Sequence, residues 1–537
     1  MLRHRLSDAA VDFACSASTN SISPTSIAQA QRRFSSQHSP GATAALPLQD
    51  DDSDSGLDHL LFGVVTSPSA RDDGSNSFPP PSDSVPSMPL SKSRDSDASV
   101  AHSLAAIIPP EIDDLLLGAY RDRAQAQYPF FHWSTFLTWV SGWKTCPPSE
   151  LASRAWQGFF VNLVYATALL LLAVPRVGQS DARSFYRSGL SLLPHVFRCK
   201  DEILHVQAHL LLSINSLHRS STPRILSLSS TTLRFCVQQQ LHLAEMEPVP
   251  TTPTTRLKNQ IRRRCFWSAY CIDRLIVASF ELPPSLSDSM ISTKLYNNID
   301  DEDLEAVAAS TPVGEEMPDA PVYTCVSPSL YVLQCRRIQS EISGYTLRYD
   351  YRENYEESSE WRVRILNELQ GYKSRVQNFS NPESKGHASQ RWLGMIYHYT
   401  LLLLYRPTKA NVMGAAGDWA IQASSQACLI FRRSQMDRQI AQGWVGLLVQ
   451  FQSGVTLLYC CWATPPEYRT ENYDSPDVSD ALRACSNILA IMADPVAPTV
   501  NLSGSCRAST IEEGNADDDT RGETLNAITA TASGDTV

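Results

Sequence analysis

The chain has 537 residues, of which 43% are hydrophobic, and it carries a formal net charge of −11. This length allows a large core together with unstructured segments. The acidic balance argues against a protein that binds DNA through its own basic surface, because affinity for phosphates needs positive charge. The 13 cysteines are scattered and form no Cys-x-x-Cys pair, so we expect reduced thiols and not the disulfide framework of a small secreted protein.

Residues 1–105 are rich in Ser, Asp and Pro, contain few aromatic residues and show no sustained periodicity. This composition predicts a disordered arm. Within the arm, residues 44–64 interleave aspartates with bulky apolar side chains, which is typical of activation segments, although an acidic linker would look similar. The charges keep the apolar side chains solvated and available to a partner, and the candidate contacts are Leu57, Leu60, Leu61 and Phe62.

Residues 107–497 differ from the arm in their residue pattern, because apolar residues recur there every three or four positions. Runs such as Leu401–Leu404 are rich in leucine and poor in β-branched residues. The pattern predicts one large all-α domain. The predicted helices cover residues 110–127, 150–174, 180–195, 201–219, 225–243, 255–280, 328–348, 360–378, 389–405, 416–435, 440–463 and 477–493.

One stretch of this domain, residues 155–174, has no formal charge and approaches the length of a membrane-spanning helix. Gln157 and Asn162 interrupt it, and Pro175-Arg176 ends it. A single candidate without charge asymmetry at its flanks is weak support for a span. We therefore interpret the stretch as a buried core helix, and we predict no membrane association.

Two further segments lack helical periodicity. Residues 298–321 contain many acidic residues, no basic residue, and Pro312, Gly314 and Pro318, which predicts a mobile acidic loop. Residues 498–537 are polar and predict a disordered tail.

The helix predicted at 255–280 combines burial with charge. Two adjacent apolar stripes run along it, which indicates burial over much of its circumference. It nevertheless carries Arg262, Arg263, Arg264, Asp273 and Arg274. Because a buried charge is costly unless it is paired, we expect these side chains to reach carboxylates or helix C-termini elsewhere in the domain.

The run Arg-Arg-Arg-x-Phe-Trp-x-x-Tyr-x-x-Asp-Arg at 262–274, followed by a proline and Asp288, resembles the signature of the regulatory middle homology domain of fungal zinc-cluster transcription factors. Weaker likeness in Tyr128–Phe136 and Tyr405-Arg406-Pro407 extends the resemblance over roughly residues 110–465. The family's Gly-Arg-Pro after this helix is replaced by Glu281-Leu282-Pro283. The residues that carry the signature are Arg262, Arg263, Arg264, Phe266, Trp267, Tyr270, Asp273 and Arg274.

The resemblance implies a nuclear transcription regulator that controls a metabolic or secondary-metabolite gene set. Its helical domain would bind co-regulators, the transcription machinery or a small effector. The family reads DNA through six cysteines that share two zinc ions, but Cys15 is the only cysteine before Cys146. We therefore predict no cofactor in this chain, and zinc would enter only through an N-terminal module that the sequence lacks.

The missing cluster leaves a second hypothesis open. The chain could be a co-regulator without its own zinc cluster, which would form a heterodimer with a complete family member and modulate it; a homodimer is the other arrangement. In either case contact with DNA would be indirect or would come through another module.

Enzyme motifs are absent: we find no phosphate-binding loop, no His-Glu-x-x-His and no Gly-x-Ser-x-Gly. A remote alternative is an all-α diphosphate-dependent cyclase, because Asp300-Asp301-Glu302-Asp303, with Asp113-Asp114 as a second pair, resembles a magnesium site. Acidic runs are more often solvated surfaces, so we predict no enzyme. His205 and His209 share a helix face, but without a third ligand they predict no metal site.

Overall fold

The computed structural model describes residues 94–172, 177–219, 222–351, 355–381, 384, 388–436 and 444–493. All of them belong to one compact unit, Val85–Val537. These residues form helices, turns and loops without a β-strand, which confirms the all-α class. The candidate activation segment 44–64 and the tail 498–537 lie outside the described residues.

The first group of helices surrounds α7 (Leu151–Leu171). Its members are α4 (Arg94–Ala106), α5 (Pro110–Tyr120), α6 (Trp133–Lys144), α8 (Val177–Val196), α9 (Glu202–Leu217) and α10 (Thr222–Gln238). Helices α4, α5, α6, α8 and α9 pack against α7, and α10 packs against α9. Residues 158–168 of α7 are buried without interruption. The uncharged stretch is therefore a core helix, as expected. Among the described residues, none of the helices is long and apolar enough to cross a membrane.

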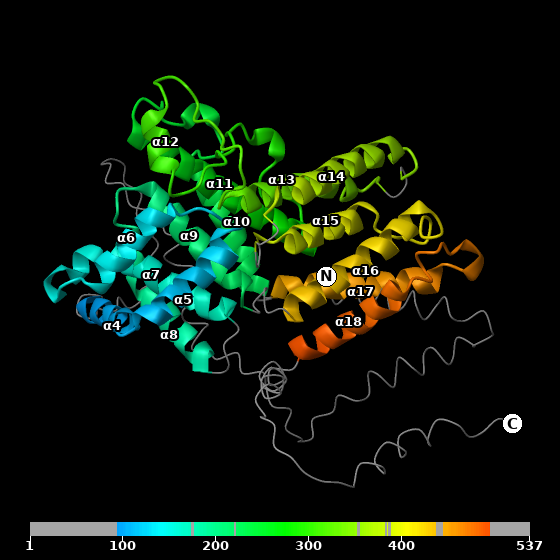
Figure 1. Ribbon diagram of the computed structural model, residues 1–537, viewed down its shortest axis with the longest axis horizontal. Coiled ribbons are helices and arrows are strands. Elements are labelled where there is room, and N and C mark those ends of the chain that lie inside the picture. The colour runs from blue at the N-terminus through cyan, green and yellow to red at the C-terminus, as the bar shows by residue number, and fades with distance from the viewer. Residues whose placement is uncertain are drawn as a thin grey trace, which may run out of the picture. The chain divides into compact units, whose positions relative to one another are not determined.

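Helix α11 (Pro253–Phe280) connects this group to the rest of the unit. It begins where Thr252 accepts a hydrogen bond from the Thr255 N–H at 3.1 Å, with Pro253 in the first turn, a favourable start for a helix. It contacts α9 and α10, and it also contacts α12 (Leu304–Ser310), α13 (Ser327–Thr346) and α17 (Trp444–Ala463). Figure 1 shows α11 and α13 between the blue-to-green helices and the yellow-to-orange ones.

The C-terminal helices are α14 (Ser359–Phe379), α15 (Gln390–Leu404), α16 (Ala415–Met436), α17 (Trp444–Ala463) and α18 (Pro476–Ala493). Helix α16 packs against α15, α17 and α18. A core of buried apolar side chains runs through this group and includes Leu369, Leu393, Ala420, Leu457 and Ala481.

Three helices differ from the sequence prediction. Helix α4 lies almost entirely within residues assigned to the disordered arm. From residue 98 onwards its fully buried side chains are the small ones of Ala98, Ala101 and Ala105, which give a weak apolar pattern. Helix α6 occupies a segment where the sequence predicts no helix. Helix α12 lies within the segment 298–321, for which the composition predicts a mobile loop, and its Leu304 and Ala308 pack with Ile299 and Met317.

Candidate functional site

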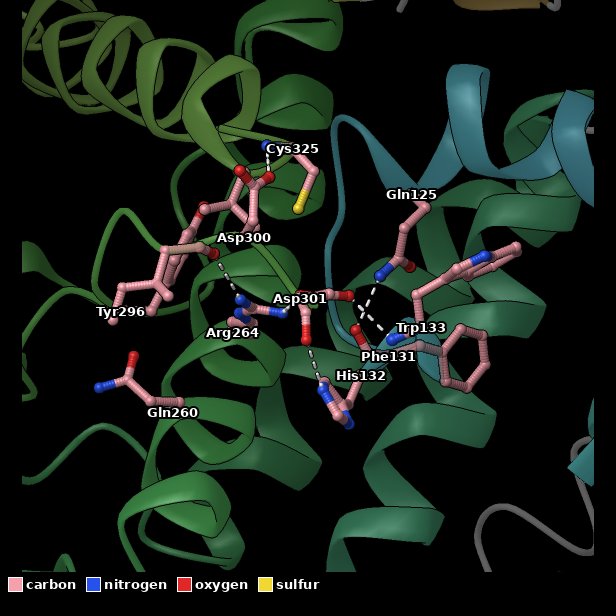
Figure 2. A network of polar contacts seen from close by, with 12 residues as sticks. Gln125, Phe131, His132, Trp133, Gln260, Arg264, Tyr296, Asp300, Asp301 and Cys325 are labelled. Carbon is pink, nitrogen blue, oxygen red and sulfur yellow. Dashed lines mark hydrogen bonds and ion pairs between the residues drawn. The ribbon is translucent and has the colours of Figure 1, made fainter. Parts of the chain in front are cut away.

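The charges of α11 are buried and paired inside the unit. Arg264 is fully buried, and its Nη1 lies 2.5 Å from Oδ1 of Asp301. The other carboxylate oxygen, Oδ2, accepts a hydrogen bond at 2.8 Å from the backbone N–H of Trp133, where α6 begins. His132 Nε2 lies 3.0 Å from the Asp301 carbonyl oxygen. Figure 2 shows how Asp301 thereby joins α11 to the start of α6.

Arg274 is the second fully buried guanidinium of α11. Its Nη1 donates to Asp273 at 2.5 Å, and its Nη2 donates to Asp288 at 2.6 Å. Its Nε donates to the Ser340 hydroxyl on α13 at 2.8 Å, and its guanidinium carbon lies 4.3 Å from the centre of the Tyr270 ring. Burial opposes the charged form, but Tyr270 and the two carboxylates outweigh it and raise the pKa of Arg274.

The N-terminal half of α11 holds the preceding and following loops. Arg263 forms two hydrogen bonds to the Glu247 carboxylate, at 2.8 and 2.6 Å. Arg256, which the sequence analysis did not select, donates at 2.9 Å to the carbonyl of Ala308 at the end of α12 and at 2.8 Å to that of Pro312. Arg262 is half-buried and has no hydrogen bond or ion pair within the described part of the chain.

The aromatic residues of the signature fill the space between these charges. Phe266 is fully buried, and Trp267 packs edge-to-face against both Phe266 and Tyr270. The Trp267 indole N–H donates to the carbonyl of Lys294 at 2.8 Å. The structure thus brings seven of the eight signature residues into one buried, hydrogen-bonded array, while Arg262 lies at its edge.

The acidic segment 298–321 is held in place by side chains on both sides. Asp300 accepts a hydrogen bond from the Cys325 N–H at 2.6 Å, and Asn298 donates to the carbonyls of Ala320 and Val322. Together with the Arg264–Asp301 pair and α12, these contacts correct the interpretation as a mobile loop. Counting acidic residues predicts solvation, but it does not reveal that a buried arginine on another element needs one of them.

The same contacts bear on the magnesium interpretation. Asp301 is bound by Arg264, while Asp113 binds Lys144 at 2.5 Å and accepts a hydrogen bond from the Tyr165 hydroxyl. No group of three or more side chains with metal-binding geometry occurs among the described residues. His205 and His209 bond to the backbone carbonyls of Cys199 and His205, respectively.

A pocket of about 650 Å³ lies beside Asp301. One wall comes from the π-helical turn Arg121–Gln125, the residues after it and the start of α6. The other comes from the acidic segment, the start of α13 with the residues before it, and Asn381, Ser384 and Ala388 between α14 and α15. The residues of the pocket include Arg121, Asp122, Gln125, Pro129, Trp133, Leu137, Asp300, Asp301, Glu302, Asp303, Tyr323, Cys325, Val326 and Pro328. Sequence reasoning missed this pocket because its walls lie almost 180 residues apart in the chain.

The amide of Gln125, beside the pocket, has only one of its two polar atoms in a hydrogen bond. Its Nε2 donates to the Phe131 carbonyl at 2.7 Å, whereas its buried Oε1 has no hydrogen-bond partner among the described residues. Figure 2 shows Gln125 and Trp133 on one side of Asp301, with Asp300 and Cys325 on the other. The site therefore combines acceptors, an indole and apolar side chains around a fixed ion pair.

Comparison with known proteins shows which family and which individual proteins this chain resembles. Residues 117–374 match the family described as the fungal specific transcription factor domain. The chain is 23% identical over 343 residues to the pyrimidine pathway regulatory protein 1 of Saccharomyces cerevisiae. The aligned region covers 61% of this chain and 37% of that protein. It is 23% identical over 385 residues to the citrinin biosynthesis transcriptional activator ctnR of Monascus purpureus, covering 64% of this chain and 61% of the relative.

A third relative is the ascochitine biosynthesis cluster transcriptional regulator of Didymella fabae, with 26% identity over 202 residues, or 36% of this chain and 32% of that protein. The chain spans little more than a third of the length of the pyrimidine pathway regulator. The citrinin and ascochitine relatives are named as transcriptional regulators, and the yeast relative is named as a pathway regulatory protein. Residues 117–374, which include the whole of α11 and its ion pairs, are therefore the part of this chain that is similar to the fungal specific transcription factor domain.

Proposed function

We propose that the chain regulates transcription in the nucleus and that it controls a metabolic or secondary-metabolite gene set. The observation that carries the proposal is the family match over 117–374, within which α11 buries Arg264, Asp273 and Arg274 in ion pairs. Relatives named for a pyrimidine pathway and for citrinin biosynthesis support the class of target genes.

In this proposal the helical domain, predicted over 107–497, is the regulatory part. The eight signature residues of α11 act as a structural signature that fixes how the surrounding helices pack. Residues 44–64 act as the activation segment, in which Leu57, Leu60, Leu61 and Phe62 contact the transcription machinery or a co-regulator.

A reporter assay tests the activation role. The full chain is fused to a foreign DNA-binding domain upstream of a reporter gene, and we expect transcription from that reporter. Replacing Leu57, Leu60, Leu61 and Phe62 by Ala should abolish it, while the matched replacement of Asp51, Asp52, Asp54 and Asp58 by Asn should lower it by removing the charges that keep the apolar groups solvated. Equal activity of the alanine variant would assign activation to another segment.

The route to DNA is the second part of the proposal. The 537 residues contain no Cys-x-x-Cys pair, so DNA contact would come from a zinc-cluster module outside them or from a complete family member bound as a heterodimer. We expect the purified chain to bind neither stoichiometric zinc nor a specific DNA sequence. Metal analysis that gives two zinc ions per chain, or a specific mobility shift by this chain alone, would contradict the expectation. Co-purification of a zinc-cluster protein that restores the shift would support the heterodimer.

A further inference from the structure

Helix α17 presents a row of apolar side chains on its outer face. The members of the row are spaced four, three and four positions apart, which places them on one side of a helix; they are Phe451, Val455, Leu458 and Trp462. Val455 is 43% exposed, Leu458 57% and Trp462 42%, while Phe451 is half-buried. Single exposed leucines are ordinary on a protein surface, whereas a continuous apolar row marks a contact site.

The sides of α17 that face the protein bury polar groups instead. Gln450 and Ser453 are fully buried, and neither polar atom of the Gln450 side chain nor the Ser453 hydroxyl has a hydrogen-bond partner in the described part of the chain. A helix that borders solvent normally turns its polar side to water and its apolar side to the core. Helix α17 lacks this division and contains no charged residue, which is the pattern of a helix that is covered on every side.

The charges around α17 favour a second copy of the chain as the cover. In a twofold dimer each surface meets its own copy, so a face with a net charge would repel itself. The row has no charge, and two helices that pack against α17 carry both signs: α16 has Asp418 and Arg433, and α18 has Asp480 and Arg483. A twofold axis can therefore bring the uncharged row against itself and leave opposite charges to pair around it.

The spacing of the row also fits a second copy. Alternating steps of three and four residues form a heptad seam, in which the side chains of two helices interlock as knobs in holes. The acidic segment 44–64 fits less well, because its aspartates would find no basic residue on α17. The row therefore suits an identical, uncharged helix better than it suits this segment.

We propose that the chain forms a homodimer in which the row Phe451–Trp462 of α17 packs against the same row of a second copy. Val455 and Leu458 lie at the centre of the row, so they become the most deeply buried residues of the interface. The interface lies within the helical domain and requires neither zinc nor DNA. It does not rest on the proposed function.

Sedimentation equilibrium of the purified full chain over a range of concentrations tests the inference. We expect an equilibrium between monomer and dimer. Val455→Asp combined with Leu458→Asp should weaken dimerisation about 100-fold or more, because the new charges would be buried without partners in an apolar contact. Both side chains are exposed in the single chain, so circular dichroism should show unchanged helical content. A wild-type chain that stays monomeric at submillimolar concentration would overturn the proposal.

Val363→Asp combined with Phe379→Asp is the matched control. These side chains are 54% and 66% exposed on α14, so the same two charges enter the surface of another helix. Dimerisation should be unchanged. If this control weakens dimerisation as much as the α17 variant does, the added charge and not the row is responsible, and the proposal fails.

A mixture of two charged variants tests whether the row meets its own copy. Val455→Asp with Leu458→Asp and Val455→Lys with Leu458→Lys should each be monomeric. A parallel pair of rows places each position against itself, and an antiparallel pair places residue 455 against residue 458, so either arrangement brings Asp against Lys. The mixture should therefore dimerise. Two charged variants that remain monomeric when mixed would contradict pairing of the row with itself.

Two other occupants of the row would give different results. A chain that dimerises only after Leu57, Leu60, Leu61 and Phe62 are replaced by Ala would assign the row to the acidic segment and overturn the proposal. A chain that stays monomeric but binds a purified zinc-cluster protein, with binding lost in the double Asp variant of α17, would assign the row to a heterodimer and also overturn it.

Discussion

Helices α11 and α17 are both central to the domain, but they are stabilised in opposite ways. Helix α11 buries four arginines, Arg256, Arg263, Arg264 and Arg274, and each contacts a carboxylate or a backbone carbonyl. Helix α17, Trp444–Ala463, contains no charged residue. It packs through apolar side chains such as Leu457 and through close approach at Gly454, where an added Cβ would lie 2.5 Å from Cys485 Sγ.

Buried ion pairs and apolar packing therefore constrain the fold in different ways. A paired buried guanidinium accepts only a partner segment that presents acceptors in the right place, because a charge without its partner is heavily penalised. An apolar face tolerates exchange of side chains when volume is conserved. We infer that α11 determines which loops lie around it, whereas α17 depends on steric fit with α16 and α18.

The largest expected effect comes from breaking the Arg264–Asp301 pair. Asp301→Ala leaves Arg264 buried without a carboxylate and the Trp133 N–H without an acceptor, so it should destabilise the fold by about 3–5 kcal/mol. Arg264→Met, which keeps the volume, should cost a similar amount by leaving the carboxylate unpaired. Urea unfolding measures both.

The double variant Arg264→Met with Asp301→Ala serves as the control for this pair. If pairing is what matters, its loss of stability is well below the two single losses combined, because no unpaired charge remains. Simple additivity would instead indicate that the two residues act separately and that α11 resembles α17.

The paired charges of α11 imply that a buried titratable group without a counter-charge is held neutral. His209 tests this prediction. Burial among Phe197 and Phe235 lowers the pKa of His209 to about 4. The unfolded chain then binds a proton more readily than the folded chain below about pH 6.5. Stability from this group is present above that pH and is lost as the pH falls toward 4, by about 2–3 kcal/mol.

Unfolding measured between pH 7 and pH 5 in the wild type and in His209→Gln reveals the contribution of this histidine. The Gln variant should show a shallower decline with falling pH, because it removes the titration while retaining a polar group of similar length. His205→Gln is the matched control, since His205 lies one turn earlier on α9. An unchanged pH slope in His209→Gln would mean that this histidine is not buried neutral.

Steric fit of α17 gives the next effect. Gly454→Ala should destabilise the domain by about 1–3 kcal/mol through overpacking against Cys485. Gly394→Ala on α15, where an added Cβ has nothing within 4 Å, should be stabilising by about 0.5–1 kcal/mol, because alanine is the better helix former. Thermal melts compare the two, and Cys485→Ala combined with Gly454→Ala should recover most of the loss.

The comparison also explains which features of the structure the sequence predicts and which it does not. Periodicity predicted α11 and α17 within a few residues of their observed bounds, and the charges on α11 correctly indicated that partners must exist. The sequence could not identify Asp301 as the partner of Arg264, because the pairing of residues 37 positions apart depends on tertiary packing. The pocket was missed for the same reason, and α4 and α12 were missed because small or acidic residues conceal their buried faces.

The smallest expected effect concerns the C-terminal end of α11, where Glu281 stands in place of the glycine of the family's Gly-Arg-Pro. Glu281 adopts a left-handed conformation with φ of 53°, which favours glycine, and its carboxylate forms an ion pair with Arg406. Glu281→Gly should relieve about 1 kcal/mol of backbone strain and lose about 0–1 kcal/mol from a pair whose arginine is exposed. The net change is thus a stabilisation below about 1 kcal/mol. Arg406→Ala isolates the ion pair, and Gln240→Gly, at a φ of 54°, isolates the backbone contribution. A marked loss of stability in Glu281→Gly, matched by Arg406→Ala, would show that α11 depends on this charge at its end as it does on those in its middle.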